Sequence, residues 1–169
     1  MIQCTDNARC IEFTILGGKT MADSENERSI TVIPDMASIS VVSEFFDSCL
    51  EEYAIPVRTG YSLKVVVDEI ISNIVYYSKA KTAEIVFKND ADQITAVFLD
   101  DGTPYNPLEN ESPDVTAGLE EREIGGLGWF MVKKIAQKID YAYSSGKNQM
   151  TVILSKSAKK KELSLEDFE

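Results

Sequence analysis

The order of strand-type and helix-type patterns constrains the fold of this chain more than any other feature of its sequence. Strands show as short β-branched runs between turn residues, and helices as apolar side chains that recur every three or four positions. Neighbouring strands joined by short turns predict a mixed, mostly antiparallel sheet, with the helices covering one face of it. The expected fold is a two-layer sandwich of the α/β (α+β) class. The segments are a strand at residues 29–33, a helix from Asp35 or Ser38 to about residue 52, a helix at 59–78, strands at 83–88 and 94–99, a loop at 101–125, a helix at 126–139, and strands at 140–143 and 149–154 around a turn at 145–148.

The length of 169 residues suits one domain with a full hydrophobic core. We expect this domain to occupy residues 21–155, with a charged tail at 156–169. The first 20 residues differ in character, because the codons of Gly17-Gly-Lys-Thr20 can form a purine-rich ribosome-binding sequence just ahead of Met21. The hypothesis is that residues 1–20 are translated leader and that Met21 is the natural start. The alternative is an extra N-terminal strand at residues 10–16.

Composition narrows the possible functions. The net charge of −11 argues against nucleic-acid binding, which needs a basic surface, and favours a protein partner unless the acidity only maintains solubility. No apolar run approaches the roughly 20 residues that span a bilayer, and no signal peptide is evident, so no membrane contact and a cytoplasmic location are expected. Histidine is absent, which excludes Ser–His triads, histidine autophosphorylation within the chain and His-ligated zinc. Cys4, Cys10 and Cys49 lack metal-type spacing and are expected to be reduced thiols.

The second helix carries Glu69 and Asn73, which are four residues apart and therefore lie on one helical face. They flank the apolar stripe of the helix, so we expect them to face a cleft. An Asn amide oxygen is a suitable ligand for Mg2+, and a carboxylate can act as a general base on a hydroxyl group. The same spacing also occurs by chance on helix surfaces. The apolar stripe is expected to comprise Leu63, Val67, Ile70, Ile74 and Tyr77.

The strand at 94–99 is followed by Asp100-Asp-Gly-Thr-Pro-Tyr-Asn-Pro107. A buried Asp100 carboxylate can accept a hydrogen bond from the amino group of adenine, and such a bond to a charged group contributes roughly 1.5–3 kcal/mol. Gly102 would let the backbone approach a flat ligand closely. The alternative is an acidic turn shaped by Pro and Gly.

The third helix opens with Gly125-Gly126-Leu127-Gly128. Glycines at a helix N-terminus allow backbone N–H groups to face an anion, and the helix dipole favours phosphate there. No Lys-Ser or Lys-Thr follows, so the motif is not a P-loop, and a flexible hinge is the alternative. The apolar residues that follow are expected to pack in the core instead of lining a ligand site; they are Trp129, Phe130 and Met131.

Taken in order, the three motifs resemble the GHKL ATPase (Bergerat) fold, and in detail its branch of anti-sigma-factor serine kinases. The stretch Arg122-Glu-Ile-Gly-Gly-Leu-Gly-Trp-Phe-Met-Val-Lys-Lys134 is similar to the second glycine box of that branch. Residues 100–107 and the closing strand at 146–151 are similar as well. The resemblance covers about residues 29–154.

The resemblance implies a role for each motif residue. Glu69 would activate the incoming hydroxyl group, and Asn73 would ligate an Mg2+ ion that bridges the phosphates of ATP. Asp100 would read adenine, and Gly102 would shape the adenine pocket. The residues that would wrap the triphosphate are Gly126, Leu127 and Gly128.

The resemblance also implies partners. Members of the branch phosphorylate a Ser or Thr on a small STAS-domain anti-anti-sigma protein and hold a sigma factor inactive, and many form homodimers. One alternative is a nucleotide-gated protein-binding module without significant kinase activity. Another is the catalytic domain of a histidine kinase, which would need a separate His-bearing partner. One departure stands out: many relatives carry His four residues after the Asn, where this chain has Tyr77.

Overall fold

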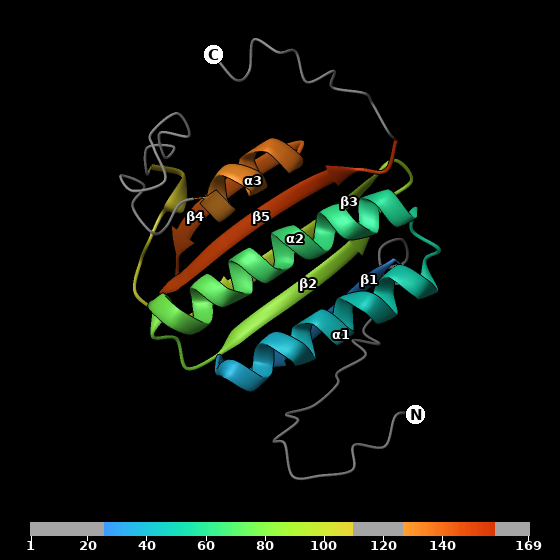
Figure 1. Cartoon of the computed structure of the whole chain (residues 1–169). Coiled ribbons are helices and arrows are strands. Elements are labelled where there is room, and N and C mark those ends of the chain that lie inside the picture. Colours follow the sequence, from blue (N-terminus) through green and yellow to red (C-terminus); the bar gives the residue numbers. More distant parts are fainter. Residues whose placement is uncertain (1–25, 110–126, 158–169) are drawn as a thin grey trace, which may run out of the picture.

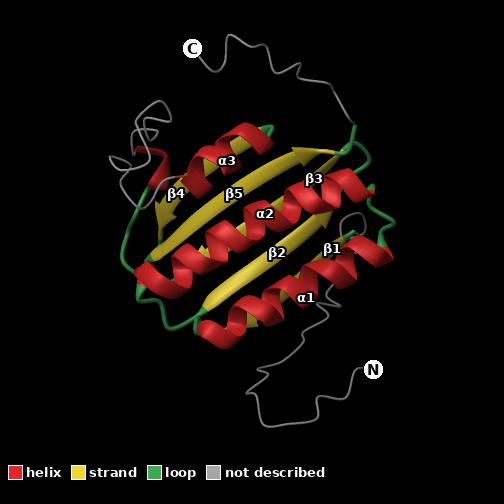
Figure 2. Ribbon diagram, viewed as in Figure 1, coloured by secondary structure: helices red, strands yellow, loops and turns green. Residues whose placement is uncertain are grey.

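The computed structural model describes residues 26–109 and 127–157. In chain order the elements are β1 (Glu27–Val32), α1 (Met36–Glu52), α2 (Val57–Asn73), the π-helical turn η1 (Ile74–Ser78), β2 (Ala83–Asn89), β3 (Gln93–Asp100), the 3-10 turn η2 (Pro107–Glu109), α3 (Leu127–Ile135), β4 (Lys138–Ser144) and β5 (Lys147–Ser155). The strands form one sheet in the order β1-β2-β3-β5-β4, and every pairing between these strands is antiparallel. The three α-helices lie on one face of the sheet (Figures 1 and 2). The expected two-layer fold is confirmed.

The first helix begins with a capping box. The Asp35 carboxylate accepts a hydrogen bond from the Ser38 N–H at 2.9 Å, and the Ser38 hydroxyl accepts one from the Asp35 N–H at 3.2 Å. Both candidate caps therefore take part, and they satisfy N–H groups that the helix itself leaves unpaired. The buried apolar face of α1 then comprises Val42, Phe45, Phe46 and Cys49.

Aromatic rings fill the core between α1 and the sheet. The fully buried Phe46 ring stacks on Phe98 of β3 at 6.3 Å between centroids and meets Phe87 of β2 edge-on at 6.0 Å. Tyr53, just after α1, stacks against Phe87 with 5.6 Å between ring centroids. Such pairs contribute about 0.5–1.5 kcal/mol beyond the burial of their area.

The second helix differs from the expected continuous helix at its C-terminal end. Leu63, Val67, Ile70 and Ile74 are buried as predicted, but Tyr77 is 72% exposed, so its place in the stripe was predicted wrongly. The reason is that α2 changes into the π-helical turn η1 after Asn73. A π-helical turn holds more residues than an α-helical turn, so the side chains beyond it leave the 3.6-residue stripe.

The last hairpin is tighter than its sequence suggested. The third helix ends at Ile135, and β4 begins at Lys138, so strand replaces the end of the predicted helix. The turn has two residues, Ser145 and Gly146, with φ of 53° and 79°. Two successive positive φ values are typical of the type I′ turn that matches the twist of a hairpin. The predicted four-residue turn was therefore wrong, and Asn148 lies inside β5.

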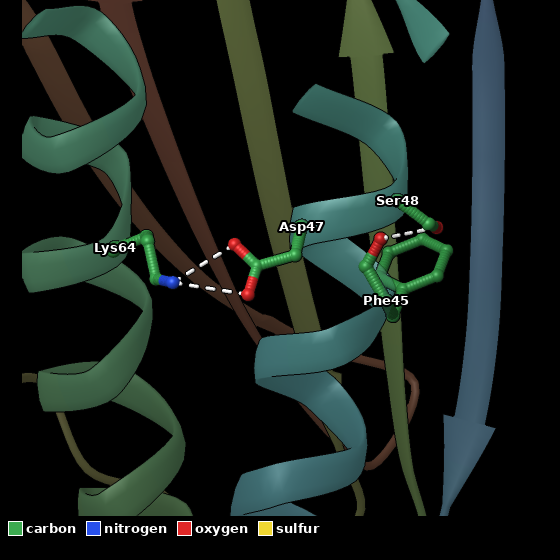
Figure 3. A network of polar contacts seen from close by, with 4 residues as sticks. All are labelled: Phe45, Asp47, Ser48 and Lys64. Carbon is green, nitrogen blue, oxygen red and sulfur yellow. Dashed lines mark hydrogen bonds and ion pairs between the residues drawn. The ribbon is translucent and has the colours of Figure 1, made fainter. Parts of the chain in front are cut away.

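Figure 3 shows one polar contact between α1 and α2 and one within α1. Lys64 of α2 pairs with the Asp47 carboxylate of α1 at 2.8 Å, and the Ser48 hydroxyl donates to the Phe45 carbonyl oxygen at 2.8 Å. Exposed ion pairs contribute little to stability, so the apolar contacts beneath them hold the two helices together.

Some of the remaining expectations concern residues that the structure describes, and others concern residues outside the described ranges. Cys49 is a free, buried thiol, and burial raises its pKa to about 12. Cys4, Cys10, the leader or extra strand at 1–20 and most of the loop at 101–125 lie outside the described residues, as does the tail beyond residue 157. Within residues 26–109 and 127–157, no helix combines the length and apolar character needed to cross a membrane.

Candidate functional site

A cavity of about 630 Å3 lies where the C-terminal end of α2, η1, α3 and the ends of β3 and β5 come together. Three residues from separate motifs, Glu69, Asn73 and Asp100, all line it. Small-molecule and cofactor pockets commonly have volumes of about 300–1,000 Å3 and largely apolar walls. The apolar part of this wall comes from Ile70, Ile74, Phe98, Trp129, Phe130 and Met150.

Glu69 and Asn73 form one hydrogen-bonded unit in α2. The Asn73 amide nitrogen donates to Glu69 Oε1 at 2.9 Å and to the Glu69 main-chain carbonyl oxygen at 2.6 Å. Both bonds use the amide N–H groups of Asn73, so its amide oxygen is the atom that remains for a ligand. An Asn amide oxygen suits a hard cation such as Mg2+.

Gly128, in the first turn of α3, lies against the same carboxylate. A Cβ atom built on Gly128 would stand 1.9 Å from Glu69 Oε2 and 2.1 Å from Glu69 Cδ. Only a residue without a side chain permits this approach. The glycine motif and the Glu–Asn motif, which are far apart in the sequence, therefore meet at Glu69.

Asp100 ends β3 with only 6% of its surface exposed. Its Oδ1 atom accepts hydrogen bonds from the Gly102 N–H at 2.9 Å and from the Asn148 amide nitrogen at 3.1 Å. Gly102 is also held closely from the other side, because a Cβ atom there would stand 2.3 Å from the Ser78 carbonyl oxygen. The turn from Asp100 to Gly102 is thus clamped between η1 and β5.

Several residues that line the cavity were not predicted from the sequence. Asn148, Tyr141 and Tyr105 line the cavity, and the Tyr141 hydroxyl donates to the Asn148 amide oxygen at 2.7 Å. Burial raises the pKa of Tyr141. Tyr105 lies in the stretch 100–107 and Asn148 in the stretch 146–151, which both resemble the family, but neither residue was given a role there. Tyr141 and Asn148 belong to the last hairpin, and their place beside the cavity depends on the pairing of β5 with β3.

The aromatic residues of α3 behave differently from the prediction. Trp129 packs against the core and also lines the cavity, and Phe130 lines the cavity too. Met131 is 42% exposed. The expectation that all three residues pack in the core was therefore correct in part for Trp129 and wrong for Phe130 and Met131. The indole N–H of Trp129 is buried and has no hydrogen-bond partner within the structure as described.

Of the two remaining residues of the glycine motif, Leu127 is described in part and Gly126 is not described. Leu127 is the first residue of α3, and nothing is described of its side chain. Gly126 lies outside the described residues. Tyr77 lines the cavity, and its ring centroid lies 6.1 Å from that of Tyr76.

Asp101, the acidic residue next to Asp100, accepts hydrogen bonds from the backbone. Its Oδ1 atom accepts from the Thr82 N–H at 2.9 Å and from the Lys81 N–H at 2.7 Å, and these bonds lower the pKa of its carboxyl group. Asp101 therefore fastens the loop before β2 and does not line the cavity. Across the described ranges, no group of three or more Cys, Asp or Glu side chains is placed to hold a metal ion.

Comparison with known proteins agrees with this geometry. Residues 32–156, most of the chain, match the family model of the histidine kinase-like ATPase domain. The chain belongs to the histidine kinase-like ATPase family. This domain therefore has the GHKL fold that its motifs suggested, and the matched range includes Glu69, Asn73, Asp100 and the glycine motif.

A solved structure shows the same fold at low sequence identity. The structure of the RsbU and RsbW domains of Rv1364c from Mycobacterium tuberculosis matches with a TM-score of 0.55 and 13% identity over 76% of this chain. The chain spans about a third of that protein, 32% of its length. The histidine kinase AdeS of Acinetobacter baumannii matches 75% of this chain and 68% of its own chain at 13% identity, with a TM-score of 0.45. No curated protein matches the sequence.

Proposed function

We propose that this chain is an ATP-dependent protein-serine/threonine kinase of the anti-sigma-factor type. The observation that carries the proposal is the meeting of Glu69, Asn73 and Asp100 in one cavity. These residues combine a base, a cation ligand and a hydrogen-bond acceptor for adenine. Membership of the histidine kinase-like ATPase family supports ATP as the ligand.

The metal part of the proposal rests on Asn73. Its amide N–H groups are both used on Glu69, which leaves its amide oxygen to ligate a cation. Mg2+ is typically held by one or two protein oxygens together with substrate phosphates and water. The residues present fit that description. Bound Mg2+ would neutralise charge on the phosphates of ATP, which is the main electrostatic requirement of phosphoryl transfer.

Glu69 is the proposed general base. Its Oε1 atom accepts from Asn73, and its carboxylate is confined on the other side by Gly128. A carboxylate fixed in this way can take the proton of a Ser or Thr hydroxyl as that oxygen attacks the γ-phosphorus. The proposal assigns the transferred proton to Glu69 and the positioning of the phosphates to the N-terminal turn of α3, with Gly126, Leu127 and Gly128 around the triphosphate.

Asp100 is the proposed adenine acceptor, and Gly102 keeps the turn beside it close to η1. The target is proposed to be a STAS-domain anti-anti-sigma protein, and the antagonised protein a sigma factor. We also propose a homodimer and a cytoplasmic location on the ground of the sequence resemblance. The acidic net charge of −11 favours protein partners with basic or mixed faces.

The deciding experiment incubates the protein with labelled ATP, Mg2+ and a STAS-domain protein from the same organism. We expect label on a Ser or Thr of that protein. Glu69→Gln keeps the size of the side chain and can still accept from Asn73, but it removes the base. General bases contribute about 10²–10⁴-fold, so transfer should fall by that factor while the Kd for ATP stays nearly the same.

Two outcomes would contradict the proposal in different ways. Tight ATP binding without transfer would favour a nucleotide-gated protein-binding module. Transfer that is equally fast in Glu69→Gln would remove Glu69 from the role of base and leave the kinase activity in place.

A further inference from the structure

Asn148 occupies a position that none of the three motifs includes. It lies in β5 directly opposite Asp100 of β3 in the sheet register. Only 6% of its surface is exposed, and it lines the cavity. A buried polar side chain must find hydrogen-bond partners, because leaving it unpaired costs about 1–3 kcal/mol. Its partners therefore reveal what the residue holds in place.

Both ends of the Asn148 amide are occupied. The amide nitrogen donates to Asp100 Oδ1 at 3.1 Å and to the Thr103 carbonyl oxygen at 3.1 Å. The amide oxygen accepts from the Tyr141 hydroxyl at 2.7 Å and from the Tyr105 N–H at 3.2 Å. The reverse orientation of the amide would place oxygen against oxygen at Asp100 and at Thr103. The network therefore allows one orientation.

This arrangement restricts the Asp100 carboxylate. Oδ1 accepts from Asn148 and from the Gly102 N–H, so rotation of the carboxylate would break two hydrogen bonds at once. Both bonds reach Oδ1, and none of the hydrogen bonds in the described structure reaches Oδ2. Oδ2 is therefore the oxygen that stays available for a ligand in a fixed direction.

We propose that Asn148 is a positioning residue that makes the site selective for a 6-aminopurine. It fixes Asp100 so that one carboxylate oxygen faces the 6-amino group of the base, and Tyr141 fixes Asn148 in turn. This inference rests on the proposed binding of ATP, and it adds a determinant of base selectivity outside the three motifs.

The probe is purine riboside triphosphate, which is ATP without the 6-amino group. Titration calorimetry of the full chain with Mg2+ should give an ATP preference over this analogue of about tenfold or more, the effect of a hydrogen bond to a charged acceptor. In Asn148→Ala the preference should fall to about threefold or less, because the carboxylate keeps only one of its two hydrogen bonds and can rotate. The affinity for the analogue itself should stay the same, since the analogue never makes this bond.

Two further variants separate positioning from folding. Tyr141→Phe removes the donor behind Asn148 and should lower the same preference by a smaller factor. It also provides the test if Asn148→Ala does not fold. Tyr143→Phe is the matched control: the same hydroxyl is removed from the same strand, but Tyr143 is 48% exposed and does not line the cavity. Its preference should equal that of the wild-type protein.

The outcomes distinguish this inference from the function beneath it. Equal losses of affinity for ATP and for the analogue in Asn148→Ala would show a purely structural residue and overturn the inference. An unchanged preference in Asn148→Ala and Tyr141→Phe would overturn it as well, while the ATP site would stand. If the wild-type protein bound neither nucleotide, the proposed function would fail, and the inference with it.

Discussion

The packing between helices and sheet differs between α1 and the region of α3 and the end of α2. Beneath α1 the space is filled, because the Phe46 ring stacks on Phe98 and meets Phe87 edge-on, and all three rings are fully buried. Beneath the end of α2 and α3, the same sheet leaves a cavity of about 630 Å3. Phe98 belongs to both regions, as a core residue and as part of the cavity wall. One side therefore supplies packing stability, and the other side holds the proposed binding site.

Gly102 and Gly128 differ in what an added Cβ atom would meet. At Gly102 an added Cβ atom would meet the Ser78 carbonyl oxygen, which belongs to the backbone and cannot move cheaply. At Gly128 it would meet the carboxylate of Glu69, the far end of a flexible side chain. Gly102 is therefore needed for the fold of the turn, whereas Gly128 is needed for the position of one carboxylate.

The largest expected effect is on the filled side. Phe46→Ala should lower the free energy of unfolding by about 3–5 kcal/mol, the usual cost of removing a buried aromatic ring. Urea unfolding measures this loss. The Kd for ATP of the folded fraction should stay within about twofold, since Phe46 does not line the cavity. A large loss of ATP affinity would show that the two regions are coupled through Phe98. It would contradict the separation of the filled core from the cavity.

Gly128→Ala should produce the opposite pattern. Ala favours a helix over Gly by roughly 0.5–1 kcal/mol, so the free energy of unfolding should stay the same or rise. The new Cβ atom would push the Glu69 carboxylate away and break its bond with Asn73. Misplacement of a catalytic group by about 1 Å can reduce the rate about 100-fold, which a phosphoryl-transfer assay would detect. Full activity in a stable Gly128→Ala protein would contradict the assigned geometry.

The smallest expected effect concerns Cys49 on the filled side. Burial raises the pKa of its thiol from an ordinary 9.0 to about 12. As pH rises above 9, the unfolded chain loses this proton before the folded chain does, so stability falls toward pH 12. Between pH 9 and 10 the loss should be about 1 kcal/mol. Cys49→Ala should show a correspondingly shallower decline, and an identical slope in both proteins would exclude this thiol as the cause.

Much of the fold could be predicted from the sequence, because its signals are local. Asp35 and Ser38 marked the start of α1, and the spacing of Leu63, Val67 and Ile70 gave the buried face of α2. Tyr77 could not be placed, because the π-helical turn that displaces it arises from packing and has no signature in the spacing.

The site could be predicted only where a motif marks it. Glu69, Asn73 and Asp100 were found by motif, and the structure brings them to one cavity. Asn148 was assigned to a turn, and its contact with Asp100 depends on the register between β3 and β5. Register between strands separated by a helix and a long loop is a tertiary property, because the side-chain alternation of each strand fits several partners.

Binding of ATP by wild-type protein and by Asp100→Asn, measured by titration calorimetry with Mg2+, tests the central claim most directly. We expect one site per chain in the wild-type protein. The variant should bind about tenfold or more weakly, because a charged acceptor for the adenine amino group is lost. Equal affinity in the two proteins would contradict the account, because ATP would then bind without the carboxylate on which the site is built.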